Sequence, residues 1–95
     1  MVEDNLEEEV KQMIIRRLNL TYINPDEISY DAPIFGGGEG SLGLDSIDGL
    51  EIVVGLGSEF GVTVTEENGR EVLTSIRSIS NFIRTKRKEL ESKNI

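Results

Sequence analysis

The sequence predicts an all-α fold: a four-helix bundle with a long loop between helices one and two and a short third helix. Three observations support this. Apolar residues recur every three or four positions in three separate stretches, which is the period of an amphipathic helix. Helix-capping residues stand directly before the expected helices. No stretch alternates apolar and polar residues for long enough to form a sheet. With 95 residues, the chain suits a single small domain.

The first helix is expected over residues 3–20, with Asp4 or Asn5 as its N-cap. Glu7 stands four residues before Lys11, a spacing that favours an ion pair along the outer face. The face expected to be buried carries apolar residues at spacings of three and four: Leu6, Val10, Met13, Ile14 and Leu18.

Residues 21–44 form a long connection, interrupted by Pro25 and Pro33 and containing four glycines at positions 36–38 and 40. A connection of this length without a regular element is uncommon in a small domain. Its apolar residues offer a way to pin it across the bundle. These residues are Ile28, Ile34, Phe35, Leu42 and Leu44.

The second helix is expected over residues 45–60. Asp45 is a good N-cap, which places Ser46 at the first helical position and Asp48 near the electropositive end of the helix dipole. Gly61 is a suitable left-handed stop.

The interior of this second helix contains three glycines, each of which costs about 1 kcal/mol relative to alanine. Two interpretations are open for Gly49, Gly55 and Gly57. The glycines either open space beside the helix for a bound molecule or allow another helix to approach closely. Alternatively, they mark a weakly stable helix.

A short extended link leads to Thr65, which is expected to cap the short third helix ending near Leu73. Thr74 or Ser75 then caps a fourth helix. We expect one domain over residues 1–84 and a polar helical extension with a frayed tail over residues 85–95. The fourth helix is expected to bury Ile76, Ile79, Phe82 and Ile83.

The chain contains no cysteine and no histidine. Their absence excludes a Ser-His-Asp triad, a Cys-His pair and the common zinc sites. No general base other than capping carboxylates stands beside Ser46. We therefore expect no catalytic residues, no metal site and no enzymatic activity.

The net charge of −8 is distributed unevenly. Residues 18–69 hold ten acidic residues and no Lys or Arg, a charge of −10 that leaves +2 for the two ends. Nucleic acid and anionic membrane are poor partners for such a surface, whereas a basic patch on a protein complements it. The acidic N-terminus and the absence of an 18-residue apolar run predict a cytoplasmic protein without membrane insertion. We also expect a monomer.

The run LGLDSIDGLEIVVGLGSEFGVTV, residues 42–64, resembles the prosthetic-group site of acyl carrier proteins. In that family a Gly-x-Asp-Ser-Leu or Gly-x-Asp-Ser-Ile turn opens the second helix and a Glu-Phe-Gly segment closes it. The resemblance extends from Leu6 to Ile83 and includes the closing SIRSISNFI segment.

The resemblance implies that Ser46, flanked by Asp45 and Ile47, carries 4'-phosphopantetheine. A separate phosphopantetheinyl transferase would attach this arm from coenzyme A through a phosphodiester. The arm would then hold acyl groups as thioesters in fatty-acid, polyketide or related specialised acyl metabolism. The first-turn amides favour the arm's phosphate, but the carboxylates beside Ser46 oppose it, so we expect an arm that is not held tightly to the surface.

Two further sets of residues are expected to serve this function. Acidic residues of the second helix are expected to dock acyl-transferring, synthase or ligase enzymes through basic patches: Asp48, Glu51 and Glu59. An apolar pocket for the acyl chain is expected beside the second helix, lined by Val53, Val54, Leu56, Val64 and Ile76. Carrier proteins often place further acidic residues where this chain has Gly57 and Ser58.

Two alternatives stay open at this point. A stand-alone aminoacyl or peptidyl carrier also has Asp-Ser-Ile, although such carriers usually have a second glycine where this chain has Leu44. An acidic interaction module with the carrier fold would leave Ser46 unmodified. The sequence specifies neither the cargo nor the pathway.

Overall fold

The computed structural model describes residues 5–37 and 40–93, with side chains up to residue 90. Its helices are α1 (Leu6–Leu18), the 3-10 turn η1 (Pro25–Glu27), α2 (Ser46–Phe60), α3 (Glu66–Val72) and α4 (Ile76–Lys93). Within these ranges the only β-type pairing is an isolated bridge between Phe35 and Leu44. The predicted all-α fold with a short third helix is confirmed.

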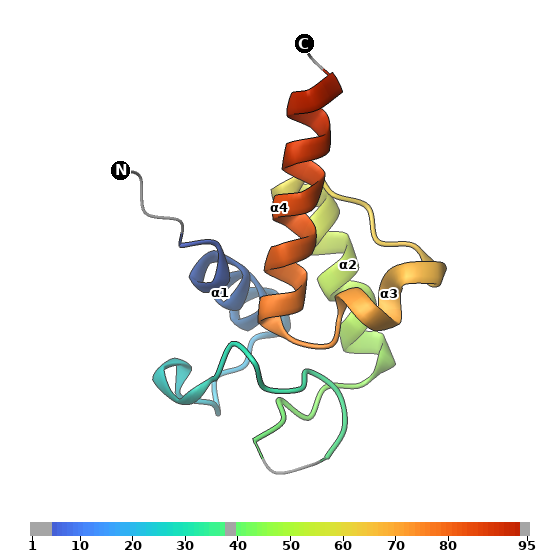
Figure 1. The fold of residues 1–95 in the computed structure, drawn as a ribbon. Coiled ribbons are helices and arrows are strands. Elements are labelled where there is room, and N and C mark those ends of the chain that lie inside the picture. The colour runs from blue at the N-terminus through green and yellow to red at the C-terminus, as the bar shows by residue number, and fades with distance from the viewer. Residues whose placement is uncertain (1–4, 38–39, 94–95) are drawn as a thin grey trace.

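Figure 1 shows how the helices are arranged. Helix α4 packs against α1 on one side and α3 on the other, and α2 lies behind α4 and also packs against α1. The connection between α1 and α2 runs across one end of the bundle (Figure 1). The fully buried side chains come from α1, α2, α4 and this connection: Leu6, Val10, Met13, Ile14, Ile34, Ile52, Leu56, Ile76, Ile79, Ser80 and Ile83.

Helix α1 is shorter than predicted. It begins at Leu6, and Asn5 occupies the N-cap position without a side-chain hydrogen bond to the helix. Asp4, the other predicted cap, lies outside the described residues. The helix ends at Leu18 because Asn19 adopts the left-handed conformation, with φ of 52°.

The long connection is pinned across the bundle as predicted. The backbone N–H of Ile34 donates to the carbonyl oxygen of Thr74 at 3.1 Å, and that of Leu44 donates to the carbonyl oxygen of Ile34 at 3.1 Å. The side chains of Ile34, Leu42 and Leu44 are buried, and those of Ile28 and Phe35 pack against the core. These contacts fix the position at which α2 begins.

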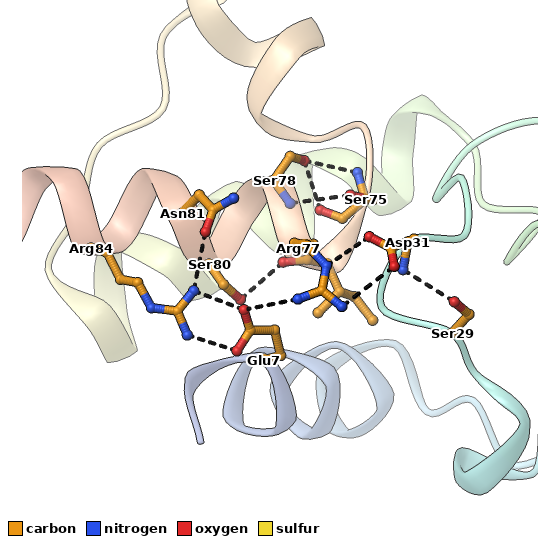
Figure 2. Close-up of polar contacts among 10 residues, drawn as sticks. Glu7, Ser29, Asp31, Ser75, Arg77, Ser78, Ser80, Asn81 and Arg84 are labelled. Carbon is orange, nitrogen blue, oxygen red and sulfur yellow. Dashed lines mark hydrogen bonds and ion pairs between the residues drawn. The ribbon is translucent and has the colours of Figure 1, made fainter. Parts of the chain in front are cut away.

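Glu7 joins α1 to α4 rather than pairing with Lys11 (Figure 2). Its two carboxylate oxygens each accept a hydrogen bond from Arg84 at 2.7 Å. Arg77 lies 3.8 Å from the same carboxylate and forms a second ion pair with Asp31 at 2.7 Å (Figure 2). The prediction that Glu7 pairs with Lys11 is therefore wrong. Glu7 is buried between α1 and α4, where the packing of the helices brings it to Arg84. Lys11 instead contacts Glu8 at 2.9 Å.

The Glu7→Gln variant should be less stable than the wild type at pH 7, and the difference should shrink as the pH is lowered from 4.5 to about 3. The hydrogen bonds from Arg84 hold the pKa of Glu7 below its ordinary value of 4.5. A carboxylate with a lowered pKa stabilises the fold above its unfolded pKa, and this contribution is lost as the pH falls through the folded pKa. Thermal unfolding should show that the free energy of unfolding of the variant is lower by about 2 kcal/mol at pH 7. An equal loss at both pH values would contradict a role for the charge.

Local capping sets the starts of the last two helices. The Thr65 hydroxyl accepts from the backbone N–H of Asn68, and the Asn68 side chain accepts from that of Thr65. Ser75 and Ser78 make the same reciprocal pair at the start of α4 (Figure 2). Helix α4 continues to Lys93, so a domain boundary at residue 84 stays a prediction. The end of the predicted frayed tail, residues 94–95, lies outside the described residues.

Candidate functional site

Two aspartates cap the start of α2, each accepting a hydrogen bond from the backbone of the other. The carboxylate of Asp45 accepts from the backbone N–H of Asp48 at 3.0 Å, and the carboxylate of Asp48 accepts from the backbone N–H of Asp45 at 3.1 Å. This capping box satisfies two amides that the helix itself leaves unpaired. The sequence correctly predicted Asp45 as the cap.

Ser46 is the first residue of α2, and its side chain is exposed. No hydrogen bond joins its hydroxyl to the part of the chain that the structure describes. Ile47 follows with 76% of its surface exposed, so it does not belong to the core. The two aspartates are occupied in capping, and the serine hydroxyl between them is directed to solvent rather than activated by a base.

The loop before α2 is held by its own hydrogen bonds. Gly43 has φ of +67°, a conformation that favours glycine, and its N–H donates to the Ser41 hydroxyl at 3.0 Å. The Ser41 hydroxyl in turn lies 2.9 Å from the carbonyl oxygen of Gly36. Together with the buried Leu44, this arrangement orients the chain that leads into Ser46.

An open groove of about 570 Å³ lies beside Ser46, between α2, α3 and the long connection. Its walls are largely apolar, and Arg70 is the one basic side chain among them. The absence of a side chain at Gly49 leaves room for the ring of Phe35, because a Cβ atom there would stand 3.0 Å from that ring. The groove is lined by Pro33, Phe35, Ser46, Gly49, Leu50, Val53, Val64, Thr65, Glu66, Gly69, Arg70, Leu73 and Thr74.

Two of the five predicted pocket residues, Val53 and Val64, line this groove. The other three do not. Leu56 and Ile76 are buried in the core, with at most 1% of their surface exposed, and Val54 is 56% exposed outside the groove. The sequence shows that all five residues are apolar. It does not distinguish a side chain that faces the core from one that faces a groove. Leu50 was missed as a lining residue, although it follows Ser46 by one helical turn.

The acidic residues predicted for docking differ in their surroundings. Arg17 of α1 donates to Glu51 at 2.9 Å and to Glu59 at 2.7 Å, and Arg16 also pairs with Glu59. The hydrogen bond from Arg17 lowers the pKa of Glu59, and the bond to Glu59 raises the pKa of Arg17. Asp48 makes no ion pair with any described residue. The sequence did not reveal that Arg16 and Arg17 of α1 pair with acidic residues of α2.

Comparison with known proteins identifies the family to which this chain belongs. The family model described as "Phosphopantetheine attachment site" matches residues 8–83, the greater part of the chain. The chain belongs to this family. It is also 32% identical over 82 residues to an acyl carrier protein of Buchnera aphidicola, across 86% of this chain and 92% of that protein. It is 37% identical over 73 residues to acyl carrier protein 5, chloroplastic, of Arabidopsis thaliana, across 77% of this chain. The chain spans about half of the Arabidopsis protein's length, since the match covers 48% of it.

Family membership defines the general chemistry. The prosthetic group is 4'-phosphopantetheine, and the protein is a carrier rather than a catalyst. Its partners are a phosphopantetheinyl transferase and enzymes that handle acyl groups. In the described part of the chain, no group of His, Cys, Asp or Glu side chains is placed to hold a metal ion. No described helix is long and apolar enough to cross a membrane.

Proposed function

We propose that this protein carries acyl intermediates on a 4'-phosphopantetheine arm attached to Ser46. The observation that carries the proposal is the position of this residue: an exposed serine at the first turn of α2, beside an apolar groove and within the matched family region. When bound, the arm supplies a thiol that holds an acyl group as a thioester.

The residues around Ser46 fit such an arm. Its hydroxyl is unobstructed, and the backbone amides at the start of α2 favour the phosphate of a phosphodiester. On attachment, the Ser46 oxygen forms the new ester bond to phosphorus while adenosine 3',5'-bisphosphate leaves from coenzyme A. The hydroxyl proton passes to a base outside this chain, since no side chain of the described residues hydrogen-bonds to the Ser46 hydroxyl. Those carboxylates also repel the phosphate, so the arm is mobile rather than bound along its length.

The groove supports a second part of the proposal, that apolar cargo shelters beside α2. Val53 and Val64 from the predicted pocket, together with Phe35 and Leu50, provide an apolar surface continuous with Ser46. Burial of an acyl chain against such a surface is favourable by roughly 0.8 kcal/mol per methylene group. Leu56 and Ile76 would form the floor of the domain core behind this surface rather than contact the cargo.

We further propose fatty-acid, polyketide or related specialised acyl metabolism in the cytoplasm as the setting. The partner enzymes approach α2, which carries Asp48 and Glu51 near Ser46 and Glu59 near its far end. The similarity to two acyl carrier proteins favours this reading over an aminoacyl or peptidyl carrier. An unmodified interaction module stays the alternative that experiment must exclude.

The absence of cysteine makes the carrier proposal directly testable. The unmodified chain should not react with a thiol-alkylating reagent. After incubation with coenzyme A, magnesium and a broad-specificity phosphopantetheinyl transferase, intact mass should rise by one phosphopantetheinyl group, and the product should take up one alkyl group. A folded chain that gains neither mass nor a reactive thiol would point instead to the unmodified interaction module.

A further inference from the structure

The groove beside Ser46 contains a cation that no described acidic group neutralises. Arg70 of α3 lines the groove, its side chain is exposed, and it forms no ion pair with any described residue. Glu66 also lines the groove and stands four residues before Arg70, a spacing that allows an ion pair along a helix, but the two side chains do not form one. The guanidinium N–H donors of Arg70 are therefore available to a ligand.

The other polar side chains of α3 and its ends offer a ligand much less. The Thr65 hydroxyl accepts from the backbone N–H of Asn68, and the Thr74 hydroxyl donates to the carbonyl oxygen of Arg70 at 3.0 Å. Glu66 lies in the first turn of α3, where the helix dipole favours a carboxylate. The rest of the wall is largely apolar. A molecule in the groove thus meets an apolar surface and one available cation.

This cation affects which acyl chains suit the groove. A plain alkyl chain that covered Arg70 would remove water from the guanidinium without replacing its hydrogen bonds, which is unfavourable. A carboxylate at the same point would accept two charge-assisted hydrogen bonds from the planar guanidinium group. Residues 18–69 contain no other Lys or Arg, and Asp45 and Asp48 repel a carboxylate from the Ser46 end. Arg70 is therefore the favourable place for an anionic end group.

We propose that Arg70 is a specificity-determining residue that favours acyl chains with a carboxylate at the end of an apolar chain, that is, half-thioesters of dicarboxylic acids. This rests on the proposed carrier function and deepens it by naming the class of cargo. The methylene groups of the chain pack against the apolar walls, and the free carboxylate pairs with Arg70. The thioester itself is unchanged.

The test compares two cargoes that differ only in this charge. A broad-specificity phosphopantetheinyl transferase loads the full chain from suberoyl-coenzyme A or from its monomethyl ester, and intact mass verifies each product. We expect the suberoyl form to melt about 3 °C higher than the methyl ester form. Arg70→Gln should abolish this difference, and Arg70→Lys should retain part of it, because lysine keeps the charge but not the planar fork. The matched control Arg87→Gln removes the same charge from an exposed position on α4 and should leave the difference unchanged.

A second readout follows the Arg70 side chain directly. Its Nε–H signal in a proton–nitrogen correlation spectrum is the one that disappears in Arg70→Gln, and it should shift in the suberoyl form but not in the methyl ester form. Equal melting temperatures for the two cargoes, or a difference that persists in Arg70→Gln, would overturn the proposal. The same shift produced by the arm without cargo would assign the anion to the phosphate of the arm and would also overturn it. Failure of the wild type to load from coenzyme A itself would instead refute the carrier function, so the two failures are distinguishable.

Discussion

The Ser46→Ala variant should take up no phosphopantetheine under conditions in which the wild type is fully loaded. The alanine lacks the oxygen that forms the phosphodiester, so the effect is complete rather than partial. Folding should be nearly unaffected, because Ser46 is exposed and its hydroxyl makes no hydrogen bond to the described residues. Intact mass spectrometry after incubation with coenzyme A and the transferase measures the result.

Ser58→Ala is the matched control. Ser58 is also an exposed serine on α2, but it lies near the other end of the helix, away from the groove. This variant should gain the same mass as the wild type. Loading of Ser46→Ala, or loss of loading in Ser58→Ala, would contradict the assignment of the attachment site.

The Gly55→Ala variant should be clearly less stable than the wild type, although alanine normally favours a helix by about 1 kcal/mol. A Cβ atom at Gly55 would clash with the sulfur of Met13 and would lie 2.7 Å from Cδ of Arg17. Met13 is 1% exposed and has little room to move, and a shift of Arg17 would disturb its ion pairs with α2. Overpacking of this kind costs about 1–3 kcal/mol. With the gain in helix propensity subtracted, the net loss is up to about 2 kcal/mol, and the melting temperature should fall by up to about 15 °C.

Gly57→Ala provides the opposite expectation in the same helix. The nearest atom to a Cβ atom at Gly57 is the carbonyl oxygen of Val62 at 3.8 Å, which is ordinary contact. This variant should gain up to about 1 kcal/mol from the helix propensity of alanine. Differential scanning calorimetry of both variants would contradict the account if Gly55→Ala were the more stable one.

These two glycines also separate the interpretations that the sequence left open. Gly55 serves a close approach of α1 to α2, which no local pattern reveals. Gly49 accommodates the ring of Phe35 at the edge of the groove. At Gly57 the structure shows no close contact that requires glycine.

Local chemistry made the starts of α2, α3 and α4 and the end of α2 predictable. Asp45, Thr65 and Ser75 cap their helices through side chains within three residues, and Gly61 ends α2 in the left-handed conformation. Such signals depend on neighbouring residues alone. The attachment serine was predictable for the same reason, because its motif lies in one continuous stretch.

Ion pairs between helices were not predictable in this way. Glu7 finds Arg84, which is 77 residues away, and Arg17 finds Glu59, 42 residues away. The spacing rule for a single helix instead placed Glu7 with Lys11. The lining of the groove was predicted only in part for a related reason. The sequence shows that Leu56 and Val54 are apolar, but the packing of α2 decides that Leu56 enters the core and Val54 faces solvent.

The central claim is that Ser46 carries the arm, and the most direct measurement is fragmentation of the loaded protein by tandem mass spectrometry. A substitution tests the site by loss, whereas fragmentation locates the added group itself. The account predicts one phosphopantetheinyl group on the peptide that contains Ser46, with fragment ions placing it on that residue. The same group located on another residue, such as Ser41 or Ser58, would contradict the account.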